Sequence, residues 1–233
     1  MTTVYLIPSM LAEDVVETIP AYVLEAVKKC TVIFAENERT ARRFLKSLDK
    51  SIVIDDYEWF AIHKAEGEQV SNFKAKIKEQ KNIAIISEAG CPGIADPGQV
   101  LIAAAQEMNC IIKPLVGPNS ILLALMASGM NGQQFEFVGY LPIDNLERSK
   151  KIKELENASA KNNSTKIFIE TPYRNNQLLE SILQHCNSNS KLCIGVNITA
   201  ASESIITQTI VAWKNKKPEL HKLPAIFLLY AGK

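Results

Sequence analysis

The feature that most constrains the fold is an apolar run that ends in a loop rich in glycine and proline. Residues 82–87 (NIAIIS) are apolar at almost every position, as is typical of a strand buried on both faces of a parallel sheet. The loop that follows, residues 88–98 (EAGCPGIADPG), holds three glycines and two prolines. In an open α/β sheet, ligands bind beyond the carboxyl ends of the strands. The segment therefore predicts a buried strand that leads into a candidate ligand loop.

Short apolar runs alternate with helical patterns through the first half of the chain. Strands are predicted at 3–8, 32–35, 51–54, 82–87 and 110–115. Helices are predicted at 20–30, 38–48, 63–80, 99–108 and 119–127. Because helices separate successive strands, this half is expected to be a mostly parallel α/β sheet.

The second half has a different pattern. Helices are predicted at 146–160 and 174–186, and strands at 166–170, 192–198, 204–212 and 225–230. Residues 135–140 are predicted to be a strand or an extended linker. The last three strands follow one another without a predicted helix, which favours a mixed or antiparallel sheet. The chain of 233 residues is long enough for two small domains, and we place them at 1–116 and 117–233.

Charge and composition exclude several classes of protein. Apolar residues make up 47% of the chain and charged residues 22%, which is ordinary for a globular protein and rules out a disordered chain. Residues 1–116 hold 13 basic and 16 acidic residues, a net charge of −3; residues 117–233 hold 13 and 9, a net charge of +4. This bias is weaker than that of a dedicated duplex-binding protein, but an enzyme that touches RNA locally remains possible.

The sequence also predicts where the protein works. No basic-then-apolar leader is present, and the longest apolar stretch, 120–130, is too short to span a membrane. The five cysteines are widely spaced and include no CxxC pair, so we expect free thiols and no metal site. A cytoplasmic location is expected.

A second loop resembles the first. Residues 116–120 (VGPNS) also follow a predicted strand and open a predicted helix. Neither loop matches the phosphate-binding GxxxxGK[ST] or GxGxxG patterns. The structural alternative is that both loops are only tight connections between a strand and a helix. In that case Asp96 would cap the helix that begins near Gln99. Two such loops at one sheet edge instead favour a ligand site.

Several motifs, in order, resemble the tetrapyrrole methylase superfamily, the class III S-adenosylmethionine-dependent methyltransferases. EAGCPGIADPG is similar to SDAGxPxISDPG, and residues 35–40 (AENERT) are similar to AEDTRxT. Residues 114–120 (PLVGPNS), 135–142 (FEFVGYLP) and 170–174 (ETPYR) resemble PxPGPSA, FxFxGFLP and ExPHR. The nearest branch 2′-O-methylates a cytidine ribose in small-subunit ribosomal RNA.

The resemblance implies two α/β domains with S-adenosylmethionine in the cleft between them, and a homodimer. It implies a set of cofactor-binding residues that come from both domains. These residues are Pro8, Glu88, Ala89, Gly90, Pro92, Gly93, Ile94, Asn119, Ser120, Glu170, Ala200 and Pro224. A carboxylate at Glu88 can pair with an ammonium group or accept from a hydroxyl. A helix cap is the structural alternative for Glu88, as it is for Asn119.

The substrate side is less defined. Substrate candidates are Arg39, as a phosphate contact; His63, as a general base; and Arg174, which could instead form an internal ion pair with Glu170. Arg42 and Arg43 continue the basic helix face and are expected to be solvated. No catalytic base can be assigned, since His63, Glu36 and Glu203 are equal candidates. Trp59 and Trp213 are expected to pack in the core.

The chain departs from the family pattern at the substrate side. The glycine turn PIGNLxD becomes residues 8–14 (PSMLAED), the acid of DTR becomes Asn37, and SDAG becomes SEAG, with Glu88 one methylene longer. The lysine of ELTKxxE is replaced by Ala200, and the printed sequence ends at Lys233, where the branch has a further C-terminal segment.

These features leave three hypotheses open. The first is a methyltransferase that acts on ribosomal RNA, with RNA or a ribosomal subunit as its partner. The second is a methylase of the same fold that acts on a tetrapyrrole or another small molecule. The third is a degenerate cofactor-binding protein with an interaction role. The order of the motifs favours the first, whereas the lost lysine and the weak positive charge weaken it.

Overall fold

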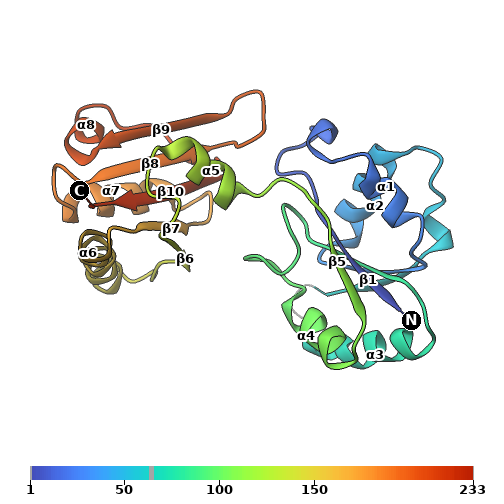
Figure 1. Ribbon diagram of the computed structural model, residues 1–233. Coiled ribbons are helices and arrows are strands. Elements are labelled where there is room, and N and C mark those ends of the chain that lie inside the picture. Colours follow the sequence, from blue (N-terminus) through green and yellow to red (C-terminus); the bar gives the residue numbers. More distant parts are fainter. Residues whose placement is uncertain (1, 63–65, 233) are drawn as a thin grey trace. The chain divides into compact units, whose positions relative to one another are not determined.

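The computed structural model describes residues 2–62 and 66–232, and the chain divides into two compact units, Met1–Asn119 and Ser120–Lys233 (Figure 1). Each unit is built around its own sheet. Among the described residues, no helix is both long and apolar enough to cross a membrane. All five cysteines are free thiols, as expected.

The first unit is a parallel sheet with the strand order β3-β2-β4-β1-β5. The strands are β1 (Thr3–Ile7), β2 (Val32–Ala35), β3 (Glu58–Ala61), β4 (Ile83–Ile86) and β5 (Ile111–Pro114). All residues of β2 and β4 are buried, because helices cover both faces of the sheet. This confirms the sheet type that the alternating sequence pattern predicts.

Two pairs of helices cover this sheet. One face packs against α1 (Tyr22–Val27) and α2 (Glu38–Leu48), through side chains such as Val23 and Phe44. The other face packs against α3 (Val70–Lys78) and α4 (Gln99–Glu107), through Phe73 and Leu101 (Figure 1). Neighbouring residues along each strand point to opposite faces, so Ile33 and Phe34 belong to different clusters.

The second unit is a mixed sheet with the order β6-β7-β10-β8-β9. Its strands are β6 (Phe135–Tyr140), β7 (Thr165–Ile169), β8 (Lys191–Val196), β9 (Ser204–Thr209) and β10 (Ala225–Tyr230). Strands β6 and β7 are parallel, and the other neighbours are antiparallel. The expectation of a mixed or antiparallel sheet is therefore confirmed.

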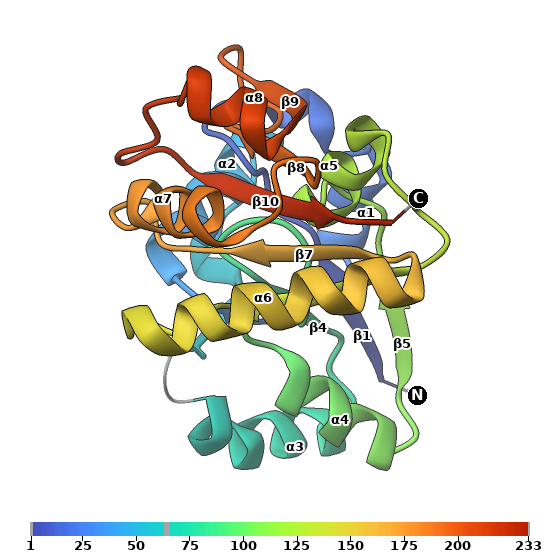
Figure 2. The same cartoon turned by 90° about the vertical axis from the view of Figure 1, so that its left-hand side faces the viewer.

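Helices also cover the second sheet. Figure 2 shows α6 (Asn145–Asn162) and α7 (Asn175–His185) lying across one face, where they share an apolar cluster with Phe168 and Phe227. Helix α5 (Ser120–Ser128) packs against β8, β9 and β10, and Thr207 donates to the Ser128 carbonyl oxygen at 2.8 Å. Trp213 is buried and donates to the Leu192 carbonyl oxygen, so its expected packing role is confirmed.

Two local predictions of strands are wrong. The apolar run 51–54 is not a strand: Ser51 closes a turn on Asp49, and a short 3-10 helix, η2 (Ile54–Asp56), follows. The edge strand is instead β3, whose ends are exposed because it has a single neighbour in the sheet. The run 204–212 is not one strand, since Thr209 caps the short helix α8 (Ile210–Asn215) and ends β9 there.

The predicted helix 63–80 is shorter than expected. Two 3-10 segments, η1 (Val16–Thr18) and η3 (Glu66–Gln69), precede α1 and α3. The start of the predicted helix, 63–65, lies outside the described residues.

Candidate functional site

The carboxyl edge of the first sheet gathers the loops that follow β1, β4 and β5. Ser9 and Gly90 exchange two backbone hydrogen bonds, with N···O distances of 2.8 and 3.1 Å. The Ser9 hydroxyl also donates to the Ser87 carbonyl oxygen at 2.8 Å. These bonds fix the turn after β1 against the loop after β4, so the two segments form one rigid surface.

Two glycines make this close approach possible. Gly90 has φ +72°, a conformation that costs other residues energy, and Leu11 packs against its α-carbon side. At Gly117, a Cβ atom would overlap the Cβ and Cγ atoms of Pro8. The loop after β5 therefore crosses the turn after β1 without room for a side chain. In the loop after β4, all three glycines, Gly90, Gly93 and Gly98, have positive φ.

The loop after β4 is anchored by a carboxylate that the sequence did not reveal. Glu66 Oε1 accepts from the backbone N–H groups of Gly98 at 3.0 Å and Val100 at 2.8 Å, at the start of α4. The expected capping role of Asp96 is wrong, since no side chain of the loop caps α4. The capping carboxylate comes from 32 residues earlier in the chain, so no local motif could have identified it.

A group of three carboxylates lies at this edge. Glu36 follows β2, and its Oε2 accepts from the Glu88 backbone N–H at 2.8 Å. The pKa of half-buried Asp96 is raised to about 7 by burial, and then by the negative charges of Glu36 and Glu88. Asp96 therefore keeps its proton at pH values where an ordinary aspartate is ionised.

Two departures from the family pattern meet in one hydrogen bond. Asn37 Oδ1 caps α2 by accepting from the Arg39 backbone N–H at 3.0 Å. Its Nδ2 donates to Glu88 Oε1 at 3.2 Å. An aspartate at position 37 could cap the helix but could not donate to Glu88. The amide of Asn37 thus suits the longer side chain of Glu88. Neither sequence motif alone predicts this pairing.

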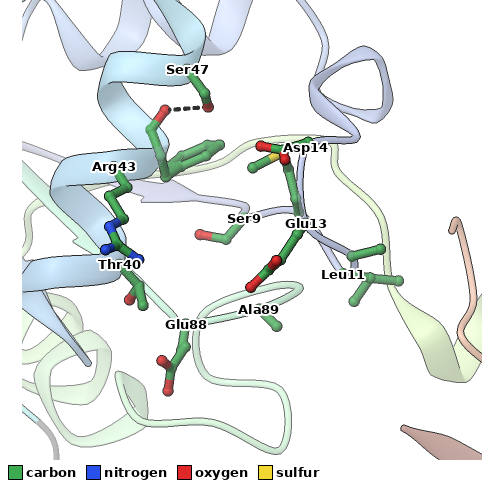
Figure 3. Close-up of a pocket in the computed structure, with 12 residues that line it drawn as sticks. Ser9, Leu11, Glu13, Asp14, Thr40, Arg43, Ser47, Glu88 and Ala89 are labelled. Carbon is green, nitrogen blue, oxygen red and sulfur yellow. Dashed lines mark hydrogen bonds between the residues drawn. The ribbon is translucent and has the colours of Figure 1, made fainter. Parts of the chain in front are cut away.

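A cavity of about 440 Å³ opens between the turn after β1, α2 and the start of the loop after β4 (Figure 3). All of its lining residues belong to the first unit. They are Ser9, Met10, Leu11, Ala12, Glu13, Asp14, Thr40, Arg43, Phe44, Ser47, Glu88 and Ala89. Of the predicted cofactor residues, the cavity contains Glu88 and Ala89. The altered first turn supplies much of one wall.

The arginines of α2 have different environments. Arg42 pairs with Glu38 at 2.9 Å and stacks over the Trp59 ring, 4.9 Å from its centroid. The Arg42 side chain is nevertheless 43% exposed, so it is solvated as expected, and it has two partners that the sequence did not reveal. Arg39 and Arg43 are exposed, as expected for Arg43, and Arg43 lines the cavity. Trp59 also donates to the Ile54 carbonyl oxygen, in agreement with its expected packing role.

The second unit has its own group of predicted residues. Glu170 Oε1 accepts from Arg174 Nη2 at 2.7 Å, and the Glu170 side chain is 1% exposed. Burial opposes the charged form of Glu170, but hydrogen bonds from Arg174 and Thr171 outweigh it and lower its pKa. The internal ion pair, one of the two expected roles of Arg174, is present.

The other predicted residues of this unit lie on nearby loops. The Asn197 N–H donates to the Pro224 carbonyl oxygen at 3.0 Å, and the Ala200 N–H donates back to the Asn197 carbonyl oxygen. Glu203 Oε2 accepts from the Thr199 N–H at 2.7 Å, which gives this candidate base a structural contact. Ser120 begins α5, directly after Asn119. His63 lies outside the described residues.

Comparison with known proteins identifies the class. Residues 16–212 match the family model described as Tetrapyrrole (Corrin/Porphyrin) Methylases. The solved structure of the methyltransferase CobJ superposes with a TM-score of 0.65 at 17% identity, covering 98% of this chain and 93% of CobJ. A uroporphyrin-III C-methyl transferase from Thermus thermophilus, complexed with S-adenyl homocysteine, has a TM-score of 0.61 at 13% identity, covering 98% and 97%. The fold is that of a class III S-adenosylmethionine-dependent methyltransferase.

The chain belongs to the tetrapyrrole methylase family. Its curated relatives include the ribosomal RNA small subunit methyltransferase I of Bacillus subtilis, 29% identical over 93% of this chain and 71% of that protein. The enzyme of the same name from Micromonospora olivasterospora is 31% identical over 74% of this chain and 52% of that protein. The chain thus spans between about half and 71% of the length of these relatives.

Proposed function

We propose that this protein transfers the methyl group of S-adenosylmethionine to RNA of the small ribosomal subunit, at a ribose 2′-oxygen. The observation that carries the proposal is its similarity to small-subunit ribosomal RNA methyltransferases, at 28–31% identity over 74–93% of the chain. The solved tetrapyrrole methylases that share its fold are 12–17% identical. The 2′-oxygen is the acceptor of the family branch that the sequence motifs resemble.

The residues at the edge of the first sheet fit this cofactor. S-Adenosylmethionine carries an ammonium group, ribose hydroxyls and an adenine amine, all of which need acceptors. The exposed Glu88 carboxylate shares one oxygen with Asn37 and can offer the other. Glu88 and Ala89 would hold the cofactor at this edge of the first sheet.

The rest of the mechanism concerns alignment and one proton. When bound, the cofactor supplies a methyl group already activated on a sulfonium. The fixed loops align the acceptor oxygen for in-line attack, which can supply much of the rate acceleration. The ribose hydroxyl must lose its proton as its oxygen bonds to the methyl carbon. We propose Asp96 as the acceptor of this proton, because it lies in the loop after β4 beside Glu36 and Glu88, and burial together with their negative charges raises its pKa.

Two further properties accompany the proposal. We expect a homodimer, which the family resemblance implies, and a cytoplasmic location where small ribosomal subunits are available. Light scattering during size-exclusion chromatography checks the first, and cell fractionation checks the second. A monomer at micromolar concentration would contradict the expected dimer without affecting the proposed chemistry.

Labelled S-adenosylmethionine tests the reaction. The protein is incubated with small ribosomal subunits that lack native methylation, or with a porphyrinogen. We expect the RNA to become labelled. Ribonuclease should convert the label to a soluble form, and alkali should fail to cleave the RNA chain next to the modified ribose. Label in the porphyrinogen would favour the tetrapyrrole hypothesis. Cofactor binding without transfer to either substrate would favour a degenerate binding protein.

A further inference from the structure

Glu66 joins the segment that follows β3 to the far end of the loop after β4. Its half-buried side chain comes from η3, and its Oε1 accepts from the backbone N–H groups of Gly98 at 3.0 Å and Val100 at 2.8 Å. The same oxygen accepts from the Leu101 N–H at 3.3 Å. The first N–H groups of a helix have no partner within the helix, and Gly98 has no side chain to offer one. One carboxylate oxygen from outside the loop therefore fixes the point where the loop becomes α4.

The loop folds back between its two ends. The Gly93 N–H donates to the Pro97 carbonyl oxygen at 3.1 Å, and a Cβ atom at Gly98 would lie 3.3 Å from the Gly93 nitrogen. The negative charge of Glu88 helps to raise the pKa of Asp96, so these two carboxylates lie close together. The far end of the loop is thus packed against its own start, and a displacement of Gly98 reaches the neighbourhood of Glu88.

The two ends of the loop are held in different ways. At the start, Gly90 exchanges two backbone hydrogen bonds with Ser9. At the far end, the contact comes from the side chain of Glu66. Between them, Ala95 has φ +64°, a conformation that costs a residue with a side chain energy and persists only while its surroundings hold it. The loop is therefore expected to relax when the contact at its far end is removed.

We propose that Glu66 is a positioning residue for methyl transfer, which fixes the far end of the loop after β4 and so keeps Glu88 and Ala89 in the geometry that binds S-adenosylmethionine. The inference rests on the cofactor site of the proposed function and deepens it, because it names the residue outside the loop that sets the loop's shape. Glu66 acts through the loop and does not itself touch the cofactor.

The simpler alternative is that Glu66 caps α4 and has no further role. Both readings expect Glu66→Ala to lower the melting temperature, so stability alone does not separate them. They differ in the affinity for the cofactor. If the Glu66 contact favours cofactor binding, linkage requires that cofactor binding favours the contact to the same extent.

Titration calorimetry with S-adenosylhomocysteine, at a temperature where circular dichroism shows each variant folded, tests the proposal. We expect Glu66→Ala to weaken binding about tenfold. Glu66→Gln should keep most of the affinity, because its amide oxygen accepts N–H groups at the same reach, whereas Glu66→Asp is one methylene short and should behave like Glu66→Ala.

Asp144→Ala is the matched control. Asp144 caps α6 in the second unit, where its carboxylate accepts from the backbone N–H groups of Leu146 at 2.9 Å and Glu147 at 3.0 Å. The variant loses a carboxylate cap of the same kind from a helix that the cofactor loop does not open. It should therefore lose stability, as Glu66→Ala does, and bind S-adenosylhomocysteine as the parent protein does.

Hydrogen exchange of the parent protein gives a second readout, which decides even if Glu66→Ala does not fold. Saturating S-adenosylhomocysteine should slow the exchange of the Val100 and Leu101 amides and leave the Leu146 and Glu147 amides unchanged. A cap with no role in positioning would leave all four amides unchanged.

Three results would overturn the proposal: a parent-like Kd in Glu66→Ala, an equal loss of affinity in Asp144→Ala, or no response of the Val100 and Leu101 amides to the ligand. The outcome is separable from that of the proposed function. If Glu66→Ala weakens binding as expected and no RNA is labelled, the acceptor assignment is wrong and the positioning role stands. If RNA is labelled and Glu66→Ala binds like the parent protein, the positioning role is wrong and the reaction stands.

Discussion

The two sheets are stabilised differently at the edges where the predicted site residues gather. At the first sheet, backbone hydrogen bonds, close glycine contacts and carboxylates that accept from backbone N–H groups hold the loops together, and no ion pair among the described residues takes part. At the second sheet, the ion pair between the buried Glu170 and the partly exposed Arg174 holds the end of β7. Backbone anchoring leaves charged side chains available for ligands, whereas anchoring by an ion pair uses them.

The largest expected effect is at Gly117, where backbone anchoring is tightest. Gly117→Ala places a Cβ atom into the ring of Pro8, which cannot rotate away, so the loops after β1 and β5 must separate. We expect a loss of about 3 kcal/mol in the free energy of unfolding, measured with urea. Gly67→Ala is the control, since a Cβ there meets no atom within 4 Å. Equal stability of the two variants would mean that the loops adjust freely.

The second effect tests anchoring by the ion pair. Arg174→Ala leaves the Glu170 carboxylate buried without its cation, and we expect a loss of about 2 kcal/mol at pH 7. The folded-state pKa of Glu170 is lowered, so this contribution is present above its unfolded pKa and is lost as the pH falls through the folded value. The loss should therefore shrink below about pH 4. Arg39→Ala, which removes an exposed arginine, should change stability by less than about 0.5 kcal/mol.

The same variant tests whether Arg174 also contacts RNA. A phosphate contact would reduce the slope of RNA affinity against salt by roughly one. A lower melting temperature with an unchanged slope would make Arg174 a structural residue alone. A reduced slope with unchanged stability would instead contradict the anchoring role of the ion pair.

A smaller effect on stability is expected at Asp96, which forms no ion pair with any residue that the structure describes. Its folded-state pKa of about 7 exceeds the unfolded value, so the folded state binds more protons and loses stability as the pH rises from about 4 to 7. Asp96→Asn removes this loss and should gain about 1 kcal/mol at pH 8, a value reduced for the solvent screening of a half-buried group. If Asp96 is the base, the variant should also lose methyl transfer by about 100-fold or more.

The substitution Asp49→Asn should change the stability in the opposite direction to Asp96→Asn. Hydrogen bonds from Ser51, aided by Lys28, lower the pKa of Asp49 to about 2. That variant should lose stability at neutral pH and approach the parent protein in acid. If both variants were more stable than the parent protein at pH 8, the loss of a negative charge in general, rather than the local environment, would control the change in stability.

The sequence predicted those features that depend on local pattern. The buried runs of β1, β2 and β4 and the positive φ of Gly90 follow from residue type and spacing. Strand β3 was missed because an edge strand with exposed ends has a weaker apolar pattern than the neighbouring run 51–54. This error also hid the role of Arg42, since Trp59, on which it stacks, lies in β3. The caps and pairs made by Glu66 and Asn37 join distant segments and leave no local signal.

The smallest expected effect concerns the hydrogen bond that joins two departures from the family pattern. Asn37→Asp keeps the cap of α2 but removes the donor to Glu88 and places a second carboxylate beside it. Because both groups are solvent-exposed, we expect a loss of only about 0.5 kcal/mol, which should shrink in 1 M salt.

A double-mutant cycle sharpens this last test. Glu88→Gln, introduced into Asn37→Asp, restores a donor opposite an acceptor with the roles reversed and removes one of the two charges. The two changes should therefore be non-additive, with the double variant more stable than the sum of the single losses predicts. Additive losses would mean that Asn37 and Glu88 do not interact in solution. In that case the amide at position 37 acts on α2 alone, and the longer acid at position 88 remains free to turn toward a ligand.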